Sequence, residues 1–367
     1  MRVLEARDRV GGRTLSQPLG ADVIDLGAQW IGPTQDRVAK LTRDLGVETF
    51  PQLHEGKKLL DRDGTVTPYS GLIPKLPIVH LLEAALGIAR LELLARKVPT
   101  DHPDRARNAA RWDAMTAEDW LSRSIRTRGA KTVLRIATEM IFGAEPRDLS
   151  FLYFLFYLRS GGGFLRLAEI EGGAQQDRLV GGAQQLSIRL GERLDGRVEM
   201  NAPVTAILQD SDGVTVRKGT EGAELRARYV ILALSPSLAH RIPVTPALPA
   251  ARLALQQRMP MGSVIKCVAA YKSPFWREMG LSGEAISDGS PLRAVFDDTS
   301  HDGKQPALVA FIVGDAARTF SAEPAEMRRS AVLGGLARCS ASAPAPRWRT
   351  PTRTGSSTRG AGAATPA

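Results

Sequence analysis

The first residues of the chain combine an acid and a glycine turn at short spacing. The apolar pair at residues 3–4 is followed by Glu5, and Gly11, Gly12 and Arg13 come shortly after. An acid at the end of a strand can accept hydrogen bonds from ribose hydroxyls. Glycine lets a phosphate approach the backbone closely, and the neighbouring arginine supplies a cation. The segment could therefore hold part of a dinucleotide; an ordinary turn with an exposed arginine is the alternative.

Lys266 is the second residue whose surroundings indicate chemistry. It lies in the run 263–270, where most other residues are apolar, so the run predicts a strand. Burial of an unpaired ammonium group is costly unless the group finds partners or loses its proton. Lys266 is therefore a candidate functional residue, and an edge-strand lysine that reaches solvent is the alternative.

Composition argues against several other kinds of site. The two cysteines, Cys267 and Cys339, are far apart, and the five histidines show no HxH or HxxxH spacing. We therefore expect neither a disulfide framework nor a metal site. Aromatic residues make up 5% of the chain, which is little material for a nucleic-acid stacking surface. Half of the net charge of +10 is carried by arginines from residue 338 onward, so the rest is only mildly basic.

The chain shows no sign of a leader or a membrane span. It opens on residues 2–5, RVLE, rather than on a basic segment followed by an apolar run, which favours a cytoplasmic location. The most apolar stretch, 76–94, contains Glu83, Arg90 and Glu92, so we expect an amphipathic helix there and no membrane span.

Hydrophobic periodicity predicts alternating regions of strand and helix. Residues 68–178 are expected to be mainly helical, and strands are expected before and after them. The tail from 338 to 367 is rich in Ala, Pro, Arg, Ser and Gly and is expected to be disordered. The predicted helices are 79–97, 116–124, 131–142, 150–160 and 325–338, and the predicted strands are 23–27, 197–200, 204–208, 214–216, 227–234, 263–271, 294–296 and 307–313.

Several longer motifs follow the first turn. They are GAQWIGPTQ at 27–35, GGAQQDRLVGG at 172–182, PV at 203–204, YVILALSP at 229–236, GSVIKC at 262–267 and PFW at 274–276. Together with the N-terminal turn, these motifs resemble the flavin-containing monoamine oxidases. The resemblance covers about residues 1–337.

The resemblance implies FAD as cofactor and gives roles to individual residues. The matching lysine, Lys266, would hold a water near flavin N5, and Gln175 would line the substrate cavity. The cofactor-binding residues would be Glu5 for the ribose, Arg7 and Arg13 for the phosphates, Gly12 for the close turn, Gly27, Ala28 and Gln29 beside the flavin, and Val204 at the adenine end.

The implied reaction is oxidation of a primary amine to an imine and then an aldehyde, with oxygen reduced to hydrogen peroxide. A family member would also carry a GxGxxG loop and a last flavin-binding segment, so we expect this chain to lack both flavin-binding ends. Three alternatives stay open. They are an inactive fragment that acts at most as a binding module, a putrescine-type polyamine oxidase that uses Glu169 and Glu171, and an amino-acid oxidase that uses Arg166.

The implied fold is α/β with an α+β second domain. An incomplete FAD/NAD(P)-binding, Rossmann-like domain (1–50 and 181–255) would be interleaved with a substrate-binding domain of mixed sheet and helices (51–180 and 256–337). The expected partners are a small-molecule amine and oxygen, with no nucleic acid and no membrane span, and a homodimer is compatible with the resemblance.

Overall fold

The computed structural model describes residues 1–339 except 21, 63, 72, 73, 75 and 290. The predicted disordered tail lies outside the described residues from position 340 onward. The chain divides into two compact units. The smaller unit contains Met1–Arg13 and Gln184–Gly262, and the larger contains Thr14–Ala183 and the described residues from Ser263 on. The assignment of 1–50 to a flavin-binding domain stays a prediction, because compactness does not show which residues bind a cofactor.

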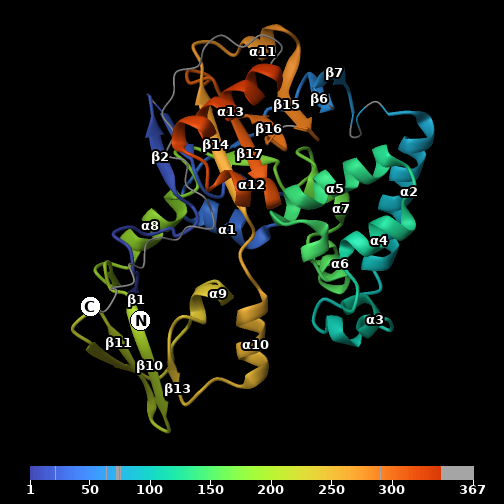
Figure 1. Cartoon of the computed structure of the whole chain (residues 1–367). Helices are drawn as coiled ribbons and strands as arrows, with labels where there is room; N and C mark the ends of the chain where they lie inside the picture. Colours follow the sequence, from blue (N-terminus) through green and yellow to red (C-terminus); the bar gives the residue numbers. More distant parts are fainter. Residues whose placement is uncertain (21, 63, 72–73, 75, 290, 340–367) are drawn as a thin grey trace. The chain divides into compact units, whose positions relative to one another are not determined.

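A six-stranded mixed sheet forms one core of the larger unit (Figure 1). Strands β15 and β6 are parallel, and the other neighbouring strands are antiparallel. Helices α12 (Gly314–Phe320) and α13 (Ala325–Cys339) contact β17 and β6 of this sheet. In sheet order the strands are β14 (Val264–Ala270), β17 (Ala307–Val313), β16 (Ala294–Asp297), β15 (Leu281–Ser287), β6 (Lys57–Arg62) and β7 (Thr65–Tyr69).

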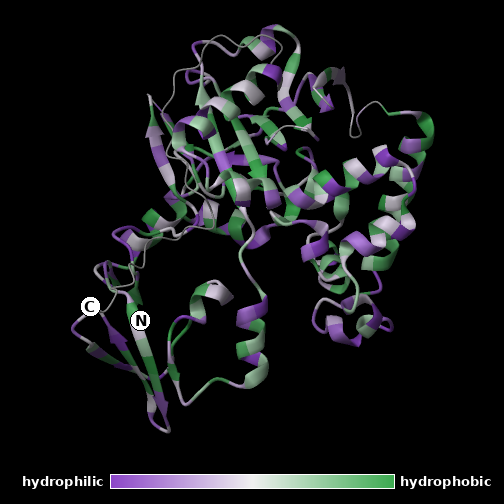
Figure 2. Ribbon diagram, viewed as in Figure 1, coloured by the Kyte–Doolittle hydropathy of each residue, from purple (hydrophilic) through white to green (hydrophobic). Residues whose placement is uncertain are grey.

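Strand β14 is covered on both faces. Ile265 and Cys267 belong to one apolar cluster, whereas Val268 belongs to another that includes Leu19 and Ile24. The last two residues lie on the hairpin of β2 (Ser16–Leu19) and β3 (Asp22–Asp25). A strand that is covered on both faces has a nearly continuous apolar sequence. Figure 2 colours the residues of this sheet by hydropathy. Alternation puts Lys266 on the same face as Val268, toward the hairpin side.

The helices predicted between 68 and 178 are confirmed, with ends shifted by a few residues. Helix α2 packs against α5, α6 and α7, and α4 packs against α6, around one apolar cluster. None of the described helices is long and apolar enough to cross a lipid bilayer. The elements are α2 (Ile78–Ala95), α3 (Ala109–Asp113), α4 (Ala117–Ser124), α5 (Arg128–Phe142), α6 (Phe151–Ser160) and α7 (Phe164–Ala168), with short 3₁₀ helices at Pro103–Arg105 and Pro146–Asp148. Outside this region, the short helix α11 (Phe275–Glu278) contacts β15.

A small sheet joins two of the longer sequence motifs. Its order is β4 (Trp30–Ile31), β8 (Asp177–Leu179) and β5 (Thr49–Pro51), and α1 (Asp36–Asp44) lies between β4 and β5 in the chain. A Cβ on Gly32 would lie 2.8 Å from the Ala174 Cα atom. A Cβ on Gly173 would lie 1.9 Å from the Glu169 carbonyl oxygen. The approach at Gly32 therefore joins the two motifs through their backbones, and the approach at Gly173 closes a turn on Glu169; both are at distances that only glycine permits.

The smaller unit combines parallel and antiparallel pairing. β1 (Val3–Leu4) pairs in parallel with β9 (Val198–Glu199). A four-stranded sheet has the order β12 (Ala223–Ala227), β11 (Gly213–Lys218), β10 (Val204–Asp210) and β13 (Val244–Thr245), and the last pair is parallel. Helices α8 (Gln185–Arg193), α9 (Pro236–Ala239) and α10 (Ala250–Arg258) complete the unit. The predicted mixed α/β class is confirmed.

The predicted strand at 227–234 is wrong. The strand in this region is β12, which ends at Ala227 opposite Val214 near the start of β11. The β11–β12 pairing ends with Val214 opposite Ala227, so residues after Ala227 have no partner residues on β11. Tyr229 and Ile231 are 84% and 88% exposed, so the apolar pattern that predicted a strand is not buried in this unit.

We expect Gly173→Ala to lower the free energy of unfolding of the larger unit by about 1–3 kcal/mol, because the new methyl group would displace the Glu169 backbone. Urea unfolding measures this change. Gly191→Ala is the control, since Gly191 lies within α8 and a Cβ there would meet only Val10, at 3.8 Å. Equal stability of Gly173→Ala and the native chain would contradict the close approach.

Candidate functional site

Lys266 is buried in the larger unit, with 7% of its surface exposed. Its ammonium Nζ donates hydrogen bonds to Gln29 Oε1 at 2.5 Å and to the Gly27 carbonyl at 3.1 Å. The rings of Trp30 and Phe311 lie with their centroids 5.8 and 5.9 Å from Nζ, a distance at which a ring face attracts a cation. These acceptors and rings compensate for the water that the lysine loses on burial.

A chain of polar contacts fixes the orientation of Gln29. Its Nε2 donates to Asp298 Oδ1 at 2.6 Å, so its Oε1 is left to accept from Lys266. Asp298 also forms an ion pair with Arg178 at 2.8 Å, and both side chains are buried. Arg178 Nη1 donates to the Thr299 carbonyl at 2.7 Å. The result is a buried series of alternating charge and dipole from Lys266 through Gln29 and Asp298 to Arg178.

Burial lowers the pKa of Lys266 from its ordinary value of 10.5 to about 8. The carboxylates of Asp298 and Asp25 oppose this shift, and Arg178 adds to it. Burial also raises the pKa of Asp25, although Lys266 and a 2.5 Å hydrogen bond from Ser16 Oγ oppose the change. Lys266 can therefore exchange its proton within about a unit of neutral pH, a property that is common at functional sites.

The loop at 27–29 presents backbone and small side chains beside this lysine. Gly27 is half-buried, Ala28 is exposed and Gln29 is buried. The Gly27 amide donates to the Leu15 carbonyl, which leaves the Gly27 carbonyl facing Lys266. The structure thus brings Gly27, Gln29 and Lys266 together from motifs more than 200 residues apart.

Gln175 is the other predicted site residue of the larger unit. Its Nε2 donates to the Leu167 carbonyl at 3.1 Å, and its buried Oε1 has no hydrogen-bond partner among the described residues. It immediately follows the Gly173-Ala174 segment that meets Gly32. The unpaired carbonyl oxygen makes Gln175 a candidate acceptor for a ligand donor.

The smaller unit carries the other predicted cofactor residues. Glu5 follows β1, and its Oε1 accepts a hydrogen bond from the Arg7 amide at 2.9 Å. Arg7 and Arg9 both donate to the Gly12 carbonyl, at 3.2 and 2.9 Å, and Gly12 has a φ of +50°. The arginines therefore hold the glycine turn closed, at a conformation that favours glycine.

Two further predicted residues, Arg13 and Val204, are close to this turn, the first along the chain and the second through a backbone hydrogen bond of the residues before it. Arg13 follows Gly12 and is exposed. The Ala202 amide donates to the Glu5 carbonyl at 2.9 Å, which brings the segment leading into Val204 beside Glu5. The smaller unit thus gathers Glu5, the glycine turn and the start of β10.

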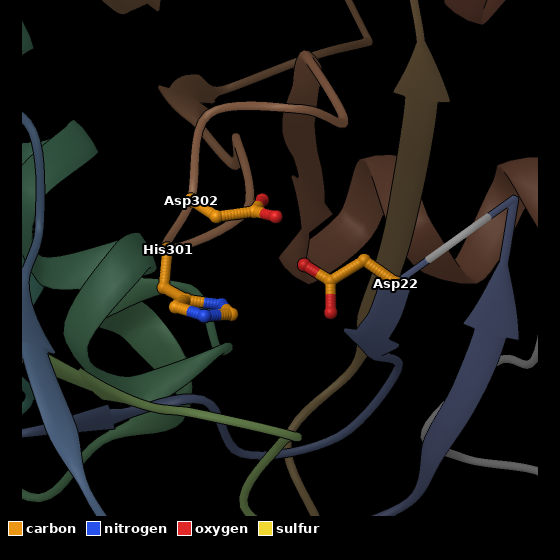
Figure 3. A group of neighbouring side chains, drawn as sticks. All are labelled: Asp22, His301 and Asp302. Atoms are coloured by element: carbon orange, nitrogen blue, oxygen red, sulfur yellow. The ribbon is translucent and has the colours of Figure 1, made fainter.

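Three other polar residues could bind a cation (Figure 3). Asp22, His301 and Asp302 each offer a ligand atom, and these atoms lie within 4.8 Å of one another. The Asp302 carboxylate already accepts from Ser300 Oγ at 2.8 Å and pairs with Lys304 at 2.8 Å. The local turn therefore accounts for the position of Asp302 without a metal.

The chain matches a protein-family model over residues 1–363, described as flavin-containing amine oxidoreductase. It belongs to the flavin-containing amine oxidoreductase family. This assignment confirms the predicted family and enzyme class, and it makes FAD the cofactor and amines the substrate class of this flavin-containing amine oxidoreductase.

Named relatives agree with the family. The chain is 39% identical to the "Probable flavin-containing monoamine oxidase A" of Dictyostelium discoideum over 92% of its own length and 74% of that protein. It is 35% identical to flavin-containing amine oxidase A of Canis lupus familiaris, over 89% of this chain and 63% of the dog protein.

Two solved structures are similar in fold. The first is wild-type putrescine oxidase bound to putrescine, with a TM-score of 0.88 and 31% identity over 92% of this chain and 76% of that one. The second is cyclohexylamine oxidase from Brevibacterium oxydans, with a TM-score of 0.88 and 32% identity over 95% of this chain and 77% of that one.

Sequence reasoning missed Asp25, Arg178 and Asp298. All three are charged residues beside apolar strand segments, the same signal that singled out Lys266. Arg178 precedes Leu179 in the DRL strand, and Asp298 follows the strand AVFD. Application of the Lys266 criterion to every charged residue within or beside a strand would have made them candidates.

We expect the lowered pKa of Lys266 to appear as a pH dependence of stability. Between pH about 8 and 10.5 the unfolded lysine holds more protons than the folded one, so the free energy of unfolding should rise with pH in this window. Lys266→Met removes this contribution. Urea unfolding of both proteins at pH 8 and 10 isolates it, and the same slope in both proteins would contradict the shift.

Proposed function

We propose that this chain oxidises a primary monoamine to an imine, which water then hydrolyses to the aldehyde. The observation that carries the proposal is the buried Lys266, held by Gln29 and Gly27 and able to exchange its proton near neutral pH. A buried lysine with such a pKa is suited to handle a proton or to hold a water close to reacting atoms.

The reaction removes two electrons and two protons from the carbon and nitrogen of the amine. FAD, when bound, supplies the electron acceptor for this step, and oxygen finally takes the electrons and protons as hydrogen peroxide. Lys266 would orient a water or hold a proton where the amine reacts. Burial around Nζ excludes bulk water, and such surroundings would favour a neutral substrate amine over its ammonium form.

The residues of the smaller unit fit the adenosine diphosphate half of FAD. Glu5 follows β1, which pairs in parallel with β9, and its carboxylate could accept from ribose hydroxyls. Gly12 has a positive φ and no side chain, so a phosphate could approach its backbone, and Arg13 beside it is exposed. We assign ribose binding to Glu5, phosphate binding to Arg13 with Arg7 near it, and the adenine end to the backbone at Val204. Gly27, Ala28 and Gln29 would border the flavin, and Gln175 would meet the substrate.

A monoamine substrate is favoured over a polyamine because the candidate acids for a second ammonium group, Glu169 and Glu171, already have basic partners. Glu169 and Glu284 face Lys58, whose Nζ lies 3.9 and 2.9 Å from their carboxylates. Lys58 therefore already pairs with the acids that would have to meet a second substrate ammonium. Glu171 is mostly exposed and lies 3.8 Å from His54. A polyamine would have to compete with these charges.

The cytoplasmic location and the homodimer belong to this proposal as well. Sedimentation velocity of the purified chain tests the assembly, and fractionation of the source cells tests the location.

We expect the purified chain to take up FAD and show flavin absorption bands, and we expect a primary amine to bleach these bands without oxygen. Lys266→Met should slow the bleaching about a hundredfold or more, because it removes the proton-handling group. Lys272→Met is the matched control, since Lys272 is exposed just beyond the same strand. A chain that stays colourless with FAD would support the inactive fragment.

Glu5→Gln should raise the dissociation constant for FAD about tenfold or more, because a charged acceptor for the ribose hydroxyls becomes neutral. Titration of the protein with FAD, followed by flavin fluorescence, measures the change. Glu224→Gln is the control, because Glu224 is an exposed acid on β12 whose contact is with Arg217. Equal affinity of Glu5→Gln and the native chain would refute the ribose assignment.

A further inference from the structure

Helix α2 carries apolar residues on two opposite faces. One face packs into the helical core of the larger unit, where Ala84, Ile88 and Leu91 are buried. The helix lies at the right-hand edge of the larger unit (Figure 1), and its other face is exposed. No other described helix exposes as many large apolar side chains. Those on α2 have exposed fractions between 57% and 67%, and they are Ile78, Val79, Leu82, Leu86 and Leu93.

These side chains form a continuous apolar stripe along the helix. Leu82 and Leu86 follow Ile78 at successive intervals of four residues, which places them on one side of an α-helix. Ala85 and Ala89 are also exposed and lie between the leucines on that side. We call this set the α2 stripe, and it consists of Ile78, Val79, Leu82, Ala85, Leu86, Ala89 and Leu93.

The α2 stripe contains no charged residue. The two acids of the helix, Glu83 and Glu92, are held by other segments, because their carboxylates accept hydrogen bonds from backbone amides. Glu83 accepts from Arg126 and Thr127 at 2.6 Å each, and Glu92 accepts from Phe164 at 2.6 Å. The stripe exposes on the order of 600 Å² of apolar surface, the upper end of what the largest apolar patch of a monomer reaches, so a contact with another surface is expected.

We propose that the α2 stripe joins two copies of this chain, with the two helices antiparallel about a two-fold axis between Ala85 and Leu86. Residues at equal distances from this axis then face each other. Leu86 meets Ala85 of the partner subunit, and Leu82 meets Ala89 of the partner subunit. Each leucine therefore packs against a small residue, which lets the helices approach closely without a cavity.

The pattern fits a second copy because it complements itself, as a two-fold interface requires. At the ends of the stripe, Ile78 meets Leu93 of the partner subunit. A parallel pair would place like residues opposite one another, so that alanine would face alanine and leave a gap. It would also bring Arg90, Arg96 and Lys97 beside their own copies, whereas antiparallel helices keep these exposed cations apart.

The contact area is sufficient for a dimer. A two-fold contact buries the stripe of both copies, about 1,200 Å² in total, which is the lower end of the range for stable protein interfaces. We therefore expect a reversible dimer whose population depends on protein concentration.

The inference rests on the homodimer of the proposed function and not on its chemistry. None of the residues assigned to FAD or to the amine belongs to the α2 stripe. The assembly can therefore be measured whether or not the chain oxidises an amine.

Sedimentation velocity of the full chain with saturating FAD, over a range of protein concentrations, measures the dimer. Leu82→Glu with Leu86→Glu should raise the dimer dissociation constant about hundredfold or more, because four carboxylates would face an apolar contact. Both leucines are exposed, so the fold should be retained. Leu255→Glu with Met327→Glu is the matched control, because it adds the same charge at apolar positions that are 44% and 60% exposed on α10 and α13.

Cross-linking tests the antiparallel register in a Cys339→Ser background, where the remaining cysteine, Cys267, is buried. Ala85→Cys should join two copies through a short bismaleimide, because residue 85 lies beside the two-fold axis. Ile78→Cys should not, because an antiparallel pair separates residue 78 from its own copy by about 22 Å along the helices.

A native chain that stays monomeric would overturn the proposal, and so would a dimer that the α2 variant leaves intact or that both double variants weaken equally. Cross-linking through residue 78 as readily as through residue 85 would overturn the antiparallel arrangement. Binding of a monomeric native chain to vesicles of phosphatidylcholine and phosphatidylglycerol, lost in Leu82→Glu with Leu86→Glu, would also overturn it, since the stripe would then belong to a membrane contact.

Discussion

The hydrogen bond between Lys266 and Gln29 is the interaction on which the larger unit depends most. A buried ammonium group is tolerated only when acceptors surround it, and here the acceptors come from loops distant in sequence. Gln29 can accept from Lys266 because Asp298 takes its amide hydrogens, and Asp298 is balanced in turn by Arg178. Displacement of any member would leave a buried charge or dipole uncompensated, so the series fixes the relative positions of the segments that carry it.

The packing around this series explains why its geometry is well defined. Lys266 is opposite Phe311 in the sheet, and Phe311 is opposite Ala294 on the next strand. Trp30 packs edge-on against Phe296 at 5.5 Å and lies 5.8 Å from Phe311. Aromatic rings thus cover the lysine where a strand register places them, and the close backbone contact at Gly32 limits movement of the loop that carries Trp30.

The larger unit deals with excess positive charge in two physically different ways. Around Lys266, burial forces the protein to supply its own acceptors and lowers the pKa of the lysine. At the beginning of α5, Arg126 and Arg128 are exposed, so water as well as protein groups can solvate them. The first arrangement is suited to proton handling at fixed geometry, and the second requires no fixed geometry.

The sequence by itself determined which residues required an explanation. A lysine in an apolar strand, an acid after the first strand and a set of short motifs between residues 27 and 276 were sufficient for the family, and hydrophobic periodicity was sufficient for the α/β class and most helices. The partners of Lys266 could not be predicted in this way, because Asp298 is 269 residues from Gln29 and their contact depends on strand register and loop packing. The error at 227–234 has the same origin, since burial of an apolar run depends on which strand lies opposite. The tertiary structure alone decided which charges are paired with which, because pairing depends on distances between elements that local sequence does not encode.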